Sequence, residues 1–179
     1  MSRNLTIGCR IPKDYFVSKG KGSSDIAYHA GAYHLMLKEC GIEMMNIMTY
    51  SSILPKIANK IDKPSFIEHG CVGECIMSTA SGKKDELIST GIIYGWLYDK
   101  ETGEKFGGLV CENGGNFSTK ELSILLRSSL YELYFNGFSD KYDLLEDSIE
   151  LNIESFVGEK QYNCVGVSLT FVNYEIPIL

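Results

Sequence analysis

Two glutamates, Glu74 and Glu112, are the first candidates for acid–base chemistry in this sequence. Apolar residues at 72 and 76 flank the first, and apolar residues at 109–111 precede the second. A carboxyl group in such surroundings loses hydration, which raises its pKa toward the value that a proton donor needs at neutral pH. Chance placement at a sheet edge, with no catalytic role, explains the pattern equally well.

The histidine and cysteines at 69–75 have the residue types of a metal site but not the spacing. This stretch is predicted to be a strand, in which Cys71 and Cys75 are about 13 Å apart. Two thiolates on one zinc ion lie within about 4 Å of each other, so we expect no metal here. The six cysteines are expected to be buried free thiols of a cytoplasmic protein.

A glycine- and serine-rich stretch at 19–24 is predicted to be a flexible loop that leads into a helix. Helix N-termini bind anions, but the P-loop order G-x-x-x-x-G-K-[ST] is absent. A substrate carboxylate is therefore a better expectation there than a nucleotide. His29 and His34 fall on the same helix, and for His29 we expect a partly buried packing role. No Ser/His/Asp set or G-x-S-x-G motif stands out.

The segment NIMTYSSILP at 46–55 resembles the self-cleavage region of the pyruvoyl-dependent arginine decarboxylases. The likeness continues in the family's order through AGAYH at 30–34, GIEMMN at 41–46, HGCVGE at 69–74 and GGLVCE at 107–112. A serine pair alone is uninformative. A serine pair followed by Ile-Leu-Pro, with an asparagine upstream and a GGLVCE strand downstream, is specific.

This resemblance implies that the chain processes itself. The hydroxyl of Ser52 attacks the preceding carbonyl, the amide becomes an ester, and elimination separates residues 1–51, which end at Ser51, from residues 52–179. Ser52 becomes a covalent pyruvoyl group, whose ketone forms an imine with the substrate amine and withdraws electrons while L-arginine loses CO2 to give agmatine. By motif, Glu112 is the proton donor and Asn46 is the processing residue.

Substrate recognition departs from the family pattern at one position. Archaeal-type members carry an aspartate near the substrate, eighteen residues before the pyruvoyl serine, and here that position is His34. A guanidinium prefers a planar carboxylate that accepts two hydrogen bonds. Either another carboxylate, Glu74 or Asp25, binds it, or the same chemistry acts on a different amino acid. Arginine remains the first expectation.

Asn46 raises a question of geometry. In a fully extended strand, Asn46 and Ser52 would be about 20 Å apart. Either the chain folds back at Tyr50, or Asn46 serves a site on a neighbouring subunit. The resemblance implies a homotrimer or a dimer of trimers, with sites between subunits.

The elements that must position these residues follow from the apolar patterns. Strands are predicted at 5–12, 44–51, 71–79, 87–98, 105–112, 148–156 and 164–174, and helices at 25–40 and 118–135. The first helix is expected to have Ser24 as N-cap, a buried stripe at positions 26, 30, 33 and 37, and Gly41 as its stop. A capping box at 118–121 opens the second, and Gly137 ends it. A short turn or helix is expected at 55–61, and a hairpin turn is expected around 100–103.

Composition places these elements in one globular domain. The chain has 179 residues, of which 44% are hydrophobic and 22% charged. Helices are too few to alternate with the strands, which predicts an α+β fold with mainly antiparallel sheets. The resemblance implies a four-layer αββα sandwich. A net charge of −6 argues against nucleic-acid binding, and no apolar run is long enough to span a membrane.

Two other classes of function stay open on the sequence alone. One is an unprocessed, non-catalytic oligomer of the same fold, although Ser52, Asn46 and Glu112 are all present. The other is a phosphate-binding module that uses the glycine-rich stretch at 20–24.

Overall fold

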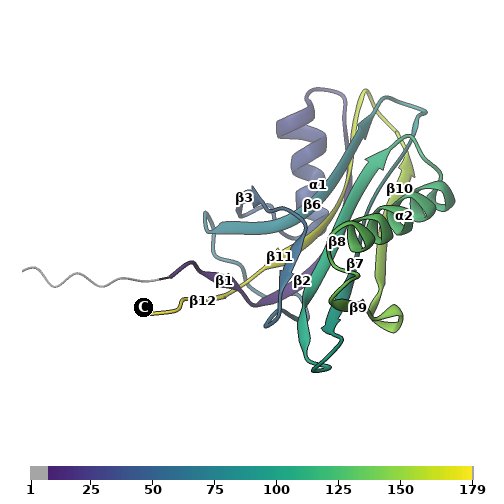
Figure 1. Cartoon of the computed structure of the whole chain (residues 1–179). Coiled ribbons are helices and arrows are strands. Elements are labelled where there is room, and N and C mark those ends of the chain that lie inside the picture. Colours follow the sequence, from purple (N-terminus) through teal and green to yellow (C-terminus); the bar gives the residue numbers. More distant parts are fainter. Residues whose placement is uncertain (1–7, 179) are drawn as a thin grey trace, which may run out of the picture.

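The computed structural model describes residues 8–178 and contains two five-stranded sheets (Figure 1). The first sheet has the order β3 (Asn46–Thr49), β6 (Val72–Gly82), β11 (Tyr162–Phe171), β2 (Asp14–Ser24) and β5 (Asn59–Lys60). The second has the order β10 (Glu150–Val157), β7 (Leu87–Asp99), β8 (Lys105–Gly115) and β4 (Ile53–Pro55), and β9 (Tyr142–Leu144) also pairs with β7. β1 (Ile11–Pro12) and β12 (Tyr174–Glu175) form a separate ribbon.

Helices cover the two outer faces of these sheets. The π-helical turn η1 (Tyr28–Tyr33) and α1 (His34–Cys40) pack on the first sheet, and α2 (Thr119–Gly137) packs on the second (Figure 1). The short 3₁₀ turn η2 (Glu146–Ser148) precedes β10. The layers are therefore helix, sheet, sheet and helix, and all strand pairs except β2–β5 and β3–β6 are antiparallel. The predicted α+β class with mainly antiparallel sheets is confirmed.

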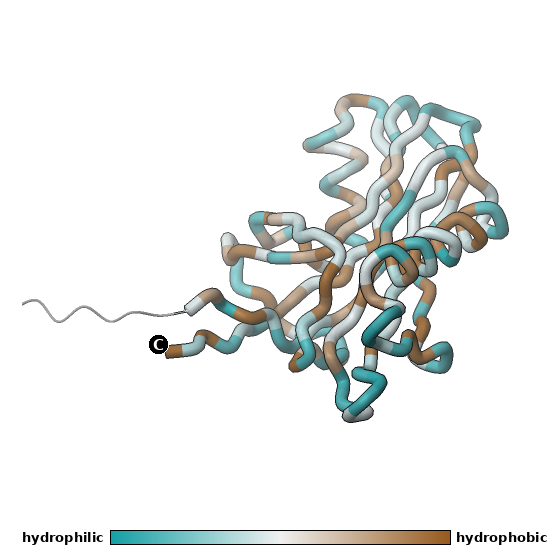
Figure 2. The backbone as a smooth tube through the Cα atoms, viewed as in Figure 1, coloured by the Kyte–Doolittle hydropathy of each residue, from teal (hydrophilic) through white to brown (hydrophobic). Residues whose placement is uncertain are grey.

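Apolar side chains fill the three spaces between the layers. Tyr15, Ile76, Tyr94 and Val110 belong to the core between the sheets, whereas three leucines of α2 pack on the second sheet. Figure 2 shows hydrophobic residues along the strands and hydrophilic residues at the tip of the β7–β8 hairpin. The core thus holds the two sheets at a fixed spacing, on which the position of the candidate site depends.

The glycine-rich stretch at 19–24 is part of strand β2, so the prediction of a flexible, anion-binding loop is wrong. A Cβ atom on Gly20 would lie 2.9 Å from the backbone nitrogen of Cys40. A Cβ on Gly22 would lie 2.7 Å from the backbone nitrogen of Met36. These glycines let η1 and α1 rest directly on the strand, because any side chain there would push the helix away.

The first helix begins later than predicted, and it buries a different face. Ser24 Oγ accepts hydrogen bonds from the amides of Ile26 and Ala27 before the helix starts, and Ala27, which has no side-chain cap, is the N-cap. Ile26 is 90% exposed. Because η1 is a π-helix, in which hydrogen bonds join residues five apart, the residues that face the sheet differ from those predicted for an α-helix. Its members are Ala32, Met36, Leu37 and Cys40. Gly41, with φ of +73°, ends α1 as predicted.

Most of the other predicted elements are confirmed with small changes at their ends, but residues 59–60 of the segment predicted as a turn or helix form strand β5. Ser118 and Glu121 form the capping box of α2, which ends at Gly137. Gly103 has φ of +71° in the β7–β8 hairpin, and the amide of Ala58 bonds to the carbonyl of Pro55 in the predicted turn. The strand predicted at 5–12 lies partly outside the described residues, and β1 is its described part.

The cysteines are all free, and the prediction of buried thiols is correct for Cys40, Cys75 and Cys164 but wrong for the other three: Cys71 and Cys111 are partly buried and Cys9 is exposed. Across residues 8–178, no helix combines the length and the apolar character that a membrane crossing requires.

Candidate active site

The predicted cleavage segment connects the two sheets. The amide of Tyr50 extends the pairing of β3 with β6 by donating to the carbonyl of Cys75 at 2.7 Å. Two residues later, the carbonyl of Ser52 accepts a hydrogen bond at 2.9 Å from the amide of Val110 in β8. Tyr50 is therefore bound to one sheet and Ser52 to the other.

The chain reverses direction within this crossing. Ser78 in β6 donates to the carbonyl of Asn113 in β8, and Ala80 lies beside Gly114, so β6 and β8 run in the same direction. β3 is parallel to β6, whereas β4 is antiparallel to β8. The fold-back near Tyr50, one of the two sequence alternatives, is confirmed. A tight turn closes it, in which the amide of Ile53 donates to the carbonyl of Ser51 at 3.0 Å.

Ser52 and Glu112 lie on the same face of the second sheet. The bond to Val110 places Ser52 opposite that residue, and Glu112 is two residues further along β8. Diagonal neighbours of this kind are separated by about 7–8 Å, which one small molecule can bridge. Glu112 is exposed in the isolated protomer. Neighbouring protein atoms nevertheless reduce the hydration of its carboxyl group, and this raises the pKa of that group. This is the direction expected from its apolar surroundings.

Asn46, at the start of β3, is not brought to Ser52 within the protomer. Its side-chain nitrogen donates to the carbonyl of Gly70 at 2.9 Å, which fixes the turn before β6. Asn46 is level with Val72 in β6, about 10 Å along that strand from Cys75, where the crossing begins.

Glu74 faces the space between the sheets, as Glu112 does, but it is 1% exposed. Its carboxylate forms an ion pair with the guanidinium of Arg10, which also lies 5.3 Å from the centre of the Tyr174 ring. Apart from this ion pair, neither carboxylate oxygen has a partner among the described residues. Arg10 could not be predicted from the sequence, because a single arginine before a short strand has no characteristic spacing.

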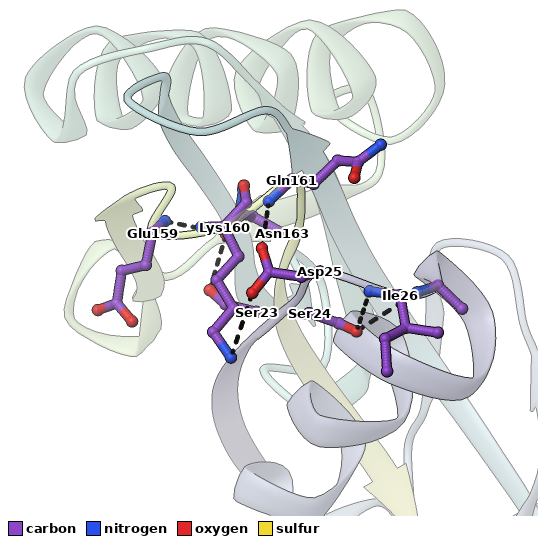
Figure 3. A network of polar contacts seen from close by, with 9 residues as sticks. Ser23, Ser24, Asp25, Ile26, Glu159, Lys160, Gln161 and Asn163 are labelled. Carbon is purple, nitrogen blue, oxygen red and sulfur yellow. Dashed lines mark hydrogen bonds and ion pairs between the residues drawn. The ribbon is translucent and has the colours of Figure 1, made fainter.

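Asp25 lies at the far end of the first sheet, in the bend before η1 (Figure 3). One carboxylate oxygen accepts the amide of Gln161 at 3.3 Å, and the other is 3.9 Å from the Lys160 ammonium. Nearby, the buried side chain of Asn163 ties this bend to the loop between β10 and β11 (Figure 3). Tyr162 pairs with Ser24 there and Thr170 pairs with Cys75, so Asp25 is about 26 Å along the strands from the level of Ser52.

A broad hollow of about 920 Å³ opens beside Asp25, with Tyr28, Lys83 and Lys84 in its wall. Asn163 also lines this hollow, and its side-chain oxygen and nitrogen already have hydrogen-bond partners within the protein. The hollow therefore has no evident connection to the chemistry at Ser52.

His34 opens α1 in the outer helical layer, where it is exposed. Together with His29, Tyr33 and Leu37 it lines a shallow hollow of about 320 Å³. His29 is exposed and stacks on the Tyr33 ring, with 5.4 Å between the ring centres, so its predicted partly buried role is wrong. Within one protomer, the first sheet separates His34 from the face that carries Ser52.

The structure thus unites Ser51, Ser52 and Glu112 but leaves Asn46, His34 and Asp25 outside that group. A hydroxyl next to a peptide carbonyl and a carboxyl group with a raised pKa can support an acyl shift and proton donation. Burial raises the pKa of the neighbouring Cys111 thiol to about 11, which keeps it neutral and a poor nucleophile at pH 7. Sequence reasoning did not identify the backbone amides of Ile53 and Val110, which donate hydrogen bonds to the carbonyls of Ser51 and Ser52.

The chain is similar to known proteins over most of its length. Residues 14–176 match the family model described as pyruvoyl-dependent arginine decarboxylase. The chain is 33% identical to the pyruvoyl-dependent arginine decarboxylase AaxB of Chlamydia muridarum (strain MoPn / Nigg) over 193 aligned positions, which cover 96% of each protein. It is 28% identical to AaxB of Chlamydia trachomatis serovar L2, again over 96% of each. AaxB of Chlamydia caviae is 34% identical over 60% of this chain and 62% of that protein.

Proposed function

This chain belongs to the pyruvoyl-dependent arginine decarboxylase family, and from that premise we propose that it cleaves itself between Ser51 and Ser52 and then decarboxylates L-arginine to agmatine. The observation that carries the proposal is the position of Ser52 beside Glu112, at the turn between the two sheets.

The hydrogen bonds of Ser52 support cleavage at this bond. Its carbonyl is held by Val110, whereas its own amide donates to no backbone carbonyl among residues 8–178. The amide nitrogen is the atom that processing removes, so its loss costs the fold no backbone hydrogen bond. A pyruvoyl group at position 52 keeps the carbonyl held by Val110, and the residues present therefore fit this group.

The processing steps use atoms of this chain and water. Oxygen Oγ of Ser52 bonds to the carbonyl carbon of Ser51, the Ser51–Ser52 C–N bond breaks, and the hydroxyl proton ends on the departing nitrogen. Loss of the Cα proton then breaks the Cβ–Oγ bond, so that Ser51 leaves as a carboxylate. Hydrolysis of the remaining dehydroalanine releases ammonia.

In the mature enzyme, the pyruvoyl ketone supplies the electron sink for decarboxylation. Glu112 provides the proton that replaces CO2 on the substrate carbon. Its raised pKa supports this role, because a larger fraction of the carboxyl group stays protonated near neutral pH.

Arginine is the proposed substrate because the family and the named relatives are arginine decarboxylases. Within the protomer, Arg10 already neutralises Glu74, and Asp25 is far from Ser52. We propose that a neighbouring subunit of a homotrimer, or of a dimer of trimers, completes the site and places His34 near the substrate. The same chemistry on a different amino acid is the alternative, because an imidazole is a weaker partner for guanidinium than a carboxylate.

Intact-mass measurement of the purified protein tests self-cleavage. We expect two chains, residues 1–51 and a fragment that begins at position 52 with a blocked N-terminus. Ser52→Ala should give one full-length chain, whereas Ser51→Ala keeps the nucleophile and should still be cleaved. A wild-type protein that keeps its full-length mass after hours of warm incubation would contradict the proposal. A screen of amino acids for CO2 release then tests arginine against the alternative.

A further inference from the structure

We propose that Arg10 positions the crossing between the sheets for self-cleavage, by pairing with Glu74 and stacking on Tyr174, beside Tyr50. This inference rests on the proposed function and concerns one of its steps, the attack on the scissile peptide bond. Arg10 directly precedes β1, which pairs with β12, the strand that contains Tyr174. Arg10 is a positioning residue, because it acts on the scissile bond only through Tyr174 and Tyr50.

The buried carboxylate of Glu74 requires a cation at this place. Glu74 is 1% exposed, and neither of its carboxylate oxygens has a hydrogen-bond partner among the described residues. Its ion pair with Arg10 is therefore its main compensation for lost hydration. A buried carboxylate without a counterion is strongly unfavourable, so Glu74 holds the guanidinium in a fixed place.

The guanidinium connects Glu74 to the aromatic side chains near the cleavage segment. Its central carbon is 5.3 Å from the centre of the Tyr174 ring, a cation–π contact. Tyr174 and Tyr50 pack against the same core between the sheets. Burial raises the pKa of Tyr174 to about 12, and the nearby Tyr50 contributes to this shift. The contacts therefore continue from Arg10 to the residue before the scissile serine pair.

The main chain of Tyr50 is held at the same place on β6. Its amide donates to the carbonyl of Cys75 at 2.7 Å, and Glu74 is the residue before Cys75. Intramolecular attack requires a narrow geometry, and a displacement of about 1 Å can slow a reaction by about 10²-fold. Without Arg10, Glu74 is a buried charge with no counterion and the Tyr174 ring loses its cation. We therefore expect Tyr50 to shift and cleavage to slow.

The test compares Arg10→Ala with Lys13→Ala, because each removes one cation from the same N-terminal segment. Lys13 forms an exposed ion pair with Glu175, which makes it the matched control. Each full-length chain is made by cell-free synthesis, and loss of the uncleaved chain is followed by mass. The folded fraction, measured as resistance to protease, normalises each rate. Arg10→Lys, which keeps the charge without the planar group, and Glu74→Gln, which keeps the shape without the charge, are milder variants.

Per folded molecule, we expect Arg10→Ala to be cleaved about 10–100-fold more slowly than the wild type, and Lys13→Ala at the wild-type rate. Arg10→Lys and Glu74→Gln should fall between the two. Because the Arg10 side chain is 53% exposed, added ethylguanidine can enter the space that Arg10→Ala leaves. It should restore part of the rate in Arg10→Ala but not in Arg10→Ala/Glu74→Gln, which lacks the charged acceptor.

Two results would overturn this inference alone, given a cleaved wild type. One is an equal rate per folded molecule in Arg10→Ala and Lys13→Ala. The other, which decides the matter if Arg10→Ala does not fold, is a wild-type rate in both Arg10→Lys and Glu74→Gln. An uncleaved wild type would overturn the proposed function and this inference together.

Discussion

On the proposed function, substitution of Glu112 should separate catalysis from processing. Glu112→Gln keeps the shape of the side chain but cannot donate a proton. We expect normal cleavage and a kcat for arginine that is lower by about 10²–10⁴-fold, the usual contribution of a positioned acid. Glu132→Gln, on the exposed side of α2, is the control and should keep full activity. A cleaved Glu112→Gln protein with wild-type kcat would exclude Glu112 from the role.

The pH dependence follows from the same residue. Loss of hydration raises the pKa of Glu112, so its donor form persists to higher pH than that of an ordinary glutamate. In the wild type, kcat should fall as pH rises through this pKa, because the proton is lost. The residual kcat of Glu112→Gln should not show this decrease with rising pH. Both pH profiles can be measured by CO2 release.

At the residue scale, the side chains that we propose to react could be predicted from the sequence, but the backbone groups around them could not. Ser51, Ser52 and Glu112 could be found because their order is specific to one family. The amides of Ile53 and Val110 could not, because every residue except proline carries the same N–H donor. Their importance comes from the crossing between sheets, which depends on pairings between strands far apart in the sequence.

At the element scale, the stretch at 19–24 shows how composition can mislead. Glycine suits flexible loops, and the sequence predicted one there. The same absence of a side chain also lets a helix backbone lie directly on a strand, and this second use applies to Gly20 and Gly22. Strands with strong alternation, such as β7 and β8, were predicted to within a few residues. The glycine-rich strand β2 was not predicted, because its conformation depends on packing against η1 and α1, which the local sequence does not show.

The contact between β2 and its helices can be tested with matched glycine substitutions. Gly22→Ala puts a methyl group against the backbone of η1 and α1, and we expect a loss of about 1–3 kcal/mol in the free energy of unfolding. Gly137→Ala, at the open end of α2, has no atom within 4 Å of the new methyl and should be neutral or stabilising by up to about 1 kcal/mol. Urea unfolding measures both. Equal stabilities would contradict the close packing.

At the scale of the whole molecule, the position of Asn46 bears on the proposed neighbouring subunit. Asn46 is bound to Gly70 and is not beside Ser52 of its own protomer, although the chain folds back. If Asn46 assists cleavage of a neighbour, Asn46→Ala chains should stay intact in oligomers of their own. They should be cleaved when co-expressed with Ser52→Ala chains, which keep the asparagine but lack the nucleophile.

The two chains carry different tags, so that mixed oligomers can be purified. Mass measurement of these oligomers then shows whether the Asn46→Ala chain is cleaved. Asn116→Ala is a suitable control, because its side chain likewise donates to a backbone carbonyl but lies at the end of β8. It should be cleaved without help. Asn46→Ala chains that stay intact in the mixtures would show that the asparagine acts within its own protomer, and cleavage of Asn46→Ala alone would show that it is dispensable.

The attachment of Tyr50 to one sheet and Ser52 to the other has a consequence for when the protein becomes reactive. The turn that holds the Ser51 carbonyl requires both sheets, packed at their final spacing. On the proposed function, a chain that has not finished folding carries no ketone and stays inert toward the amines around it. Only folded chains would then become active. The fraction of cleaved chain in a preparation would measure the fraction of molecules that reached the native state.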